Sequence, residues 1–421
     1  MTIAKFVKLW MWWGIITAAG FPLWAEEKKG GTMSYAEAKA FLDRHTEVIE
    51  LADGKGAFVA VTPEWQGRVM TSTCGSPTGP SFGFINREFI EAGRPDPHFS
   101  NYGGEDRFWL CPEGGQFSLW FKPGAKQNLE NWFTPPALNE GAWQAEVAAD
   151  NRAVRMSARL KFQNASATHF ELDVARRVRL LTVEDFAQLF GHAVAGLLKR
   201  NGVQLVAYET DNQITNLGSP LSKEKGLVSI WILGMLTAGP KTVVIVPYKP
   251  GPEAELGPVV KADYFGVVPK ERLRVTPQAV LFLGDGKYRS KIGISQRRAR
   301  AVLGSMDFES GVLTLVHFTM PDDPTKCIYL NNMWELPQKE PYVGDVVNSY
   351  NDGPNELGRQ LGNFYEIESI SPAEELKSGR SLRHCHRTVH LRADAATLHA
   401  IAEAALGVDL DVVRNTFFSN E

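Results

Sequence analysis

Two short segments near the end of the chain place carboxylates and imidazoles at alternating positions. "FYEIESI" carries Glu366 and Glu368, and "HCHRTVH" carries His384, His386 and His390, although the chain has only nine histidines. Alternate side chains of a β-strand share a face. The glutamates therefore share one face of their strand, and the histidines share one face of theirs. Such a set suits proton transfer, because a nearby carboxylate raises the pKa of an imidazole and orients its ring.

Antiparallel pairing of the two segments would bring these groups together. If Glu368 pairs with His384, Glu366 lies opposite His386, with the opposed Cβ atoms about 5 Å apart. We therefore predict Glu366 or Glu368 as a base and His384 or His386 as its partner. The glutamates themselves lie about 7 Å apart along the strand, which is compatible with the two carboxyl groups of glycosidic cleavage. The alternative is a solvated, polar sheet face.

No metal or cofactor is predicted. His384, His386 and a glutamate could bind zinc or iron, but strand histidines without a second group of ligands are usually not metal ligands. The sequence has no phosphate-binding loop, no dinucleotide fingerprint in a βαβ context and no nucleophile elbow. The formal net charge of -3, without a basic block, argues against nucleic acid as a partner.

A glycine-rich segment, "NYGGEDRFWLCPEGG", supplies the first candidate binding residues. Arg107 can donate to hydroxyls or carboxylates in a fixed fork. Trp109 offers a flat apolar face to a sugar ring, and Glu113 adds a carboxylate. The alternative is a hairpin with a salt bridge and a core tryptophan.

The segment "PYVGDVVNSYNDGP" supplies the second set of candidates. We predict a polar loop just before the glutamate strand, ending in a turn at "NDGP". Its Asp345, Asn348, Tyr350 and Asn351 suit recognition of sugar hydroxyls.

The elements that must position these residues are mostly strands. From residue 47 the chain alternates apolar and polar residues, with turn signals about every eight to twelve residues, which favours a large antiparallel β-sandwich over a βαβ fold. Ser34 caps a predicted helix at the start, and a second helix is expected at residues 394–406. We expect an N-terminal helical segment at 26–46, one β-domain at 47–392 and a helical tail at 393–421.

Several motifs, in this order, resemble the galactose mutarotase-like (aldose 1-epimerase) superfamily. They are "QGRVMTST", the glycine-rich segment above, "YETDNQITNLG" and the ending "YEIESISPAEELKSGRS". The resemblance is strongest to an exported bacterial branch distinct from the true epimerases, and it covers about residues 47 to 392. It implies an all-β supersandwich, with short helices at both ends, whose concave face binds a mono- or oligosaccharide.

The resemblance also implies residue roles. The family's catalytic glutamate near the C-terminus carries over to Glu366 or Glu368, and its sugar-contacting aspartate loosely matches Asp345. Epimerases have a histidine shortly after a Thr-Asn step, but here Asn216 is followed by Leu217. This departure argues against plain mutarotase chemistry. We expect a carbohydrate-active protein that epimerises a sugar or cleaves a glycosidic bond by hydrolysis or elimination; the alternative is a non-catalytic carbohydrate-binding or envelope protein.

The first 25 residues have the layout of a signal peptide. Lys5 and Lys8 precede an apolar stretch that ends at Ala25, so we predict cleavage there and a periplasmic or secreted protein without a stable membrane anchor. The four cysteines, Cys74, Cys111, Cys327 and Cys385, allow three disulfide connectivities, and free buried thiols are the other possibility.

Overall fold

A computed structural model of the chain describes residues 33–200, 202–355 and 358–419. The predicted signal peptide, residues 1–25, lies outside the described residues. Among the described helices, none is both long and apolar enough to cross a membrane. All four cysteines are unbonded in the structure, which agrees with the free-thiol alternative.

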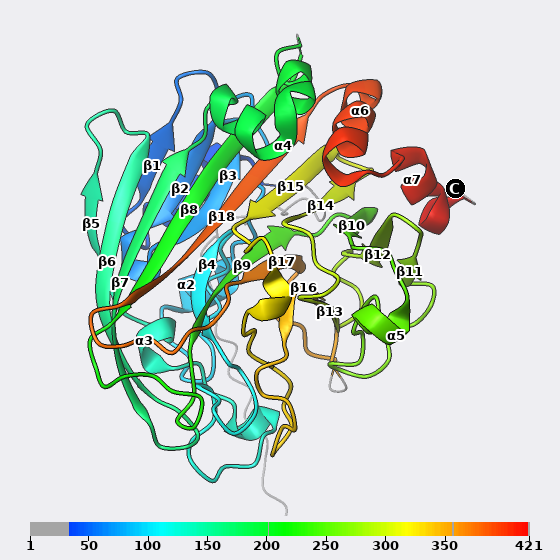
Figure 1. Cartoon of the computed structure of the whole chain (residues 1–421). Helices are drawn as coiled ribbons and strands as arrows, with labels where there is room; N and C mark the ends of the chain where they lie inside the picture. The colour runs from blue at the N-terminus through cyan, green and yellow to red at the C-terminus, as the bar shows by residue number, and fades with distance from the viewer. Residues whose placement is uncertain (1–32, 201, 356–357, 420–421) are drawn as a thin grey trace, which may run out of the picture. The chain divides into compact units, whose positions relative to one another are not determined.

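The strands of the described chain form three antiparallel sheets (Figure 1). The largest has ten strands, in the order β11 (Leu273–Val275), β12 (Ala279–Leu283), β10 (Thr242–Pro247), β14 (Val302–Asp307), β15 (Val312–Phe318), β18 (Ser381–Arg392), β8 (Gln204–Asn216), β7 (His169–Leu180), β6 (Ala153–Gln163) and β5 (Gln144–Val147). The second has five strands, in the order β13 (Ser290–Ser295), β16 (Asp345–Asn351), β17 (Phe364–Ile370), β9 (Ser229–Thr237) and β4 (Arg107–Cys111). The third has three, β1 (Ile49–Ala52), β2 (Phe58–Thr62) and β3 (Arg68–Thr73). The prediction of an all-β, antiparallel fold is confirmed.

Short helices connect or cover these sheets. They are α1 (Tyr35–Leu42), α2 (Arg87–Ala92), α3 (Pro136–Asn139), α4 (Val183–Leu197), α5 (Glu253–Leu256), α6 (Ala395–Leu406) and α7 (Leu410–Phe418), with 3-10 turns η1 (Pro63–Trp65), η2 (Leu129–Asn131) and η3 (Pro324–Lys326). The predicted first helix is confirmed, and Ser34 caps it through a reciprocal pair with Glu37. The second predicted helix is confirmed as α6, and α7 lies within the predicted helical tail, whereas α4 was not expected.

The ten-stranded sheet is covered on its two faces by different partners. In β18, Val389 and Leu391 pack in one apolar cluster with Leu398 and Ile401 of α6. Figure 1 shows α4 and α6 side by side along this outer face. Side chains at the even positions of β18 point the opposite way, toward the five-stranded sheet.

The strand β17 is buried along its whole length. One face, with Tyr365 and Ser369, meets the ten-stranded sheet: the Tyr365 hydroxyl lies 2.7 Å from the Ser305 hydroxyl of β14. The other face carries Phe364, Glu366 and Glu368. This second face is unusual because it buries two carboxylates, and carboxylates are rarely buried without partners.

Candidate functional site

The predicted pairing of the glutamate and histidine strands is wrong. β17 pairs with β16 and β9 in the five-stranded sheet, whereas β18 pairs with β15 and β8 in the ten-stranded sheet. His384 lies opposite Asn212, and His386 lies opposite Thr210. The polar connection between the two segments therefore carries the chain from one sheet to the other instead of closing a hairpin.

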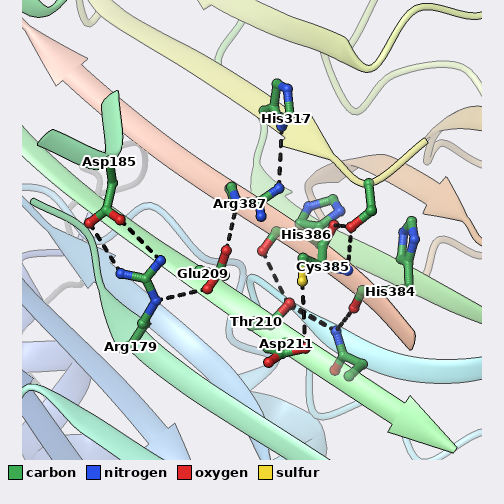
Figure 2. Close-up of polar contacts among 12 residues, drawn as sticks. Arg179, Asp185, Glu209, Thr210, Asp211, His317, His384, Cys385, His386 and Arg387 are labelled. Atoms are coloured by element: carbon green, nitrogen blue, oxygen red, sulfur yellow. Dashed lines mark hydrogen bonds and ion pairs between the residues drawn. The ribbon is translucent and has the colours of Figure 1, made fainter. Parts of the chain in front are cut away.

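The histidines are packed between the two sheets. Figure 2 shows His384 and His386 on β18, while Arg387 joins Glu209 and Arg179 in a chain of ion pairs. The Ser369 hydroxyl lies 2.8 Å from both His384 Nε2 and His386 Nδ1. Burial lowers the pKa of His384 to about 3 and that of His386 well below its ordinary value. Both imidazoles are therefore neutral core groups on the face of β17 opposite to Glu366.

His390 belongs to the same buried layer. Its Nε2 donates to Glu105 Oε1 at 2.9 Å, and its Nδ1 lies 2.9 Å from the Thr314 hydroxyl. The solvated polar face considered as the alternative is therefore not observed either, because His384, His386 and His390 are each 1% exposed or less.

The metal alternative also fails for these histidines. Among the described residues, the group of possible metal ligands that lie within reach of one another is His399, Asp409 and Asp411, on and between α6 and α7. It contains neither His384 nor His386.

The glutamate face of β17 forms part of a continuous polar surface across the five-stranded sheet. The strand register places Lys291, Tyr350, Glu366 and Met235 in one row. The next row contains Glu368. Side chains directly opposite each other in such a row have Cβ atoms about 5 Å apart, so the groups of neighbouring strands interact.

Each glutamate of this face has a buried cation as its partner. Arg107 of β4 donates from Nη2 to Glu366 Oε1. Lys291 Nζ lies 3.2 Å from Glu368 Oε2, which also accepts the indole N–H of Trp231 at 2.8 Å. The attraction within these ion pairs offsets part of the free-energy cost of burying the carboxylates.

Burial and charge set the protonation of these groups. Burial raises the pKa of Glu366 from 4.5 to about 7, with the Arg107 charge opposing the increase. Burial also raises the pKa of Glu113, with Lys291 opposing it. For Lys291, burial alone would lower the pKa, but the surrounding carboxylates, first Glu368, outweigh burial and raise it. Glu366 is therefore the carboxyl that can exchange a proton near neutral pH.

The glutamate surface opens into a pocket of about 370 Å³, within the range of small-molecule sites. Glu366 and Arg107 belong to its floor, and Glu113 belongs to its wall. Aromatic side chains line much of the remainder: Phe99, Trp109, Trp132, Trp231, Phe265, Trp334, Tyr350 and Phe364. Trp132 and Trp334 stack on each other with ring centroids 6.4 Å apart.

Several buried polar atoms of this region have no hydrogen-bond partner among the described residues. They include Nε and Nη1 of Arg107, Nε1 of Trp109 and Oε1 of Glu368. Arg107 is 2% exposed and Trp109 is 5% exposed. A buried donor left unpaired costs about 1–3 kcal/mol. These unpaired atoms lie beneath the surface of the pocket and are shielded from its interior.

The remaining predicted binding residues lie outside the pocket lining, except Tyr350. The predicted polar loop is largely strand β16. Asp345 accepts the hydroxyl of Tyr264, and the Asn348 amide donates to the same hydroxyl at 3.2 Å. Asn351 points to the other face, where its Oδ1 accepts the backbone N–H of Gly286 at 2.8 Å.

Sequence reasoning missed several residues of the pocket. Lys291 had a detectable signal, since it is the one charged residue of the strand segment "SKIGIS". Trp132, Trp334 and His98 lie in irregular segments without a periodic pattern. His98 Nδ1 donates to the backbone carbonyl of Trp132 at 2.7 Å, which leaves Nε2 available in the same pocket.

The comparisons with known proteins place the chain in a family. A family model described as "Family of unknown function (DUF6786)" matches residues 33–417. The chain belongs to this family. No curated protein matches the chain.

Solved structures with similar folds carry names from the superfamily that the sequence motifs resemble. A putative aldose 1-epimerase from Escherichia coli is 11% identical, with a TM-score of 0.45 over 83% of this chain and 99% of that one. A galactose mutarotase-like protein from Lactobacillus casei is 10% identical, with a TM-score of 0.41 over 82% and 100%. A galactose mutarotase related enzyme from Lactobacillus acidophilus is 8% identical, with a TM-score of 0.44 over 83% and 99%.

Proposed function

We propose that the pocket binds a carbohydrate and that Glu366 transfers a proton to or from the bound sugar. The observation that carries this proposal is a buried carboxyl with a pKa near 7 in a pocket walled by tryptophans. A carboxyl that is partly protonated at neutral pH is suited to general acid or base catalysis. Perturbed carboxyls of this kind are concentrated at functional sites.

Sugar binding follows from the chemistry of the pocket wall. Flat indole faces such as those of Trp132 and Trp334 pack against the apolar C–H face of a pyranose. Half-buried polar side chains of the pocket lining, His98 and Arg289, supply hydrogen bonds to ring or hydroxyl oxygens. A ligand with apolar faces and many oxygen acceptors matches both features.

Proton transfer needs a second group as well as Glu366. His98 lines the same pocket, and its Nδ1 is held by the carbonyl of Trp132. An imidazole oriented in this way can accept or donate a proton at Nε2. We assign His98 as the partner of Glu366, in place of His384 and His386. The reaction class that follows is proton exchange at a sugar, as in epimerisation, or protonation of a leaving group in glycosidic cleavage.

The second candidate function is binding without catalysis. It is favoured by the ion pair between Arg107 and Glu366, because structural ion pairs also perturb pKa values. Such a protein would use Glu366 to hold the Arg107 donors in place.

The variant Glu366→Gln separates these functions. Thermal-shift screening against monosaccharides, uronic acids and oligosaccharides first identifies a ligand, since a ligand that binds the folded state raises the melting temperature. NMR then follows anomer exchange and bond cleavage. An enzyme loses turnover in Glu366→Gln by a factor of at least about 100 while the ligand still binds. The control is Asp173→Asn, which changes an exposed carboxylate whose Oδ1 lies 3.9 Å from Nε of Arg159.

Each result decides between the candidates. Turnover that is equal in Glu366→Gln and the wild type would remove Glu366 from the chemistry. Binding by both proteins without turnover in either supports the binding function. No thermal shift from any sugar would refute the carbohydrate proposal.

Export remains a separate proposal, based on the N-terminal sequence. Cleavage after Ala25 predicts that the protein isolated from its native cells begins at Glu26. Mass spectrometry of the intact protein from each cell fraction tests this, and an intact Met1 in a soluble cytoplasmic protein would refute it.

A further inference from the structure

Arg289 differs from the buried cations of the pocket wall because it forms no ion pair with a carboxylate among the described residues. It directly precedes β13 and lines the pocket. Its guanidinium carbon lies 4.2 Å from the ring centroid of Phe265, and its Nε donates to the Tyr350 hydroxyl at 3.3 Å. Two contacts therefore fix the plane of the guanidinium group, and neither of them neutralises its charge.

The two buried cations that line the pocket each form an ion pair with a carboxylate. Arg107 pairs with Glu366, and Lys291 pairs with Glu368. Among the described residues, no carboxylate forms an ion pair with Arg289. Its two Nη groups are thus available to a ligand.

The acidic side chains nearest to Arg289 are already occupied. Asp352 accepts the Tyr350 hydroxyl at 2.7 Å and the backbone N–H of Gly362 at 2.8 Å. Burial raises the pKa of Asp352, which weakens it as a counter-charge. Elsewhere in the pocket wall, Glu113 accepts the indole N–H of Trp132 at 2.9 Å.

The register of the sheet sets the position of Arg289 relative to Glu366. Tyr350 lies directly opposite Glu366 on the neighbouring strand, and Arg289 is bonded to the hydroxyl at the end of the Tyr350 side chain. The guanidinium therefore lies at the end of the Tyr350 side chain, on the same face of the sheet as Glu366. A sugar that reaches Glu366 with one end can reach Arg289 with a substituent at the other.

We propose that Arg289 binds a carboxylate on the sugar, so that the pocket selects acidic sugars such as uronates over neutral ones. This inference rests on the proposed carbohydrate function. The planar fork of arginine matches a carboxylate with two parallel hydrogen bonds. Arg359 also lines the pocket, but it is exposed to solvent, so the half-buried Arg289 is the cation that a carboxylate inside the pocket meets. Phe265, which is 42% exposed, packs against the guanidinium group and holds it at the pocket wall.

Calorimetric titration with matched sugar pairs tests the selectivity. The pairs are glucuronate with glucose and galacturonate with galactose, and glucose 6-phosphate and glucose 6-sulfate are included as other anions. The wild type is expected to bind at least one uronate more tightly than its neutral partner. In Arg289→Gln the ratio of the two affinities falls by roughly tenfold to a hundredfold, the usual worth of hydrogen bonds to a charged group.

Two further variants make the test specific. Arg289→Lys keeps the charge but lacks the planar fork, so it restores only part of the selectivity. Arg159→Gln removes an arginine whose side chain is 60% exposed, and it leaves the ratio at the wild-type value. Circular dichroism and melting temperature establish that each variant is folded.

The outcomes separate this inference from the proposed function. If the wild type binds a neutral sugar as tightly as its uronate, or if Arg289→Gln keeps the wild-type ratio, the inference is overturned and the carbohydrate function stands. Tighter binding of the phosphate or sulfate than of the uronate overturns the choice of carboxylate. If no sugar of any kind binds, the proposed function itself fails.

Discussion

The titration of Glu366 makes a quantitative prediction about stability that needs no ligand. Burial raises its pKa from 4.5 to about 7. Between these pH values the folded protein holds a proton that the unfolded chain has released. The stabilisation from this proton is therefore full below pH 4.5 and is lost as the pH rises through 7.

The size of the effect follows from the change in pKa. One pKa unit corresponds to about 1.36 kcal/mol, so Glu366 contributes about 3 kcal/mol that disappears between pH 4.5 and 8. Glutamine cannot titrate. Glu366→Gln also leaves the Arg107 charge buried without its partner, which is destabilising, but a guanidinium stays charged throughout this range. That cost is the same at every pH and does not affect the slope.

Urea unfolding, followed by tryptophan fluorescence at half-unit steps of pH, measures the slope. We expect the unfolding free energy of the wild type minus that of Glu366→Gln to fall by about 3 kcal/mol from pH 4.5 to 8. The surface variant Asp173→Asn should follow the wild type throughout. Parallel curves for the wild type and Glu366→Gln would refute the reasoning, because Glu366 would then titrate as an ordinary glutamate and could not exchange protons near pH 7.

Three further predictions concern the groups around Glu366. Trp231→Phe removes the indole N–H that is bonded to Glu368. Trp109→Phe removes an indole N–H that has no partner among the described residues. The first variant should therefore lower the unfolding free energy by about 1–3 kcal/mol more than the second, and equal losses in urea unfolding would contradict this. Lys291→Met leaves Glu368 as a buried charge without its cation and should lower the unfolding free energy by about 3–5 kcal/mol. A loss of about 1 kcal/mol or less, as for an exposed pair, would argue against the ion pair. Burial lowers the pKa of His384 from 6.5 to about 3, so its stabilisation is lost as the pH falls from 6.5 toward 3. His384→Gln should abolish up to about 5 kcal/mol of this loss without changing sugar affinity. Weaker sugar binding in calorimetry would return His384 to the site.

Much of the fold could be predicted from local patterns. Alternating polarity and frequent turn signals gave the antiparallel sheets, and the Ser34 cap gave the first helix. The helix α4 was missed although it has 15 residues, because Gly191, which has non-helical backbone angles, interrupts its pattern. The polar content of residues 345–351 suggested a loop, but β16 buries these side chains by hydrogen bonding them within the sheet.

The candidate site could be predicted only in part. Arg107, Trp109, Glu113, Tyr350 and Glu366 lie together in the pocket, each from a segment whose composition already suggested chemistry. The pocket also needs Lys291, Arg289, Trp132, Trp334 and His98, which come from distant segments. Their proximity depends on strand order, which no local pattern encodes.

The sequence by itself determined which side chains share a face. Period-two alternation placed Glu366 with Glu368, and His384 with His386, because successive side chains of any strand point in opposite directions. Only the tertiary structure decided which faces meet. β17 and β18 joined different sheets, so His384 and His386 became neutral groups between the sheets, while Glu366 came to line the pocket and Glu368 was buried beside it. The reason is that strand pairing is chosen by the burial of whole sheet faces, a sum over many residues far apart in the chain.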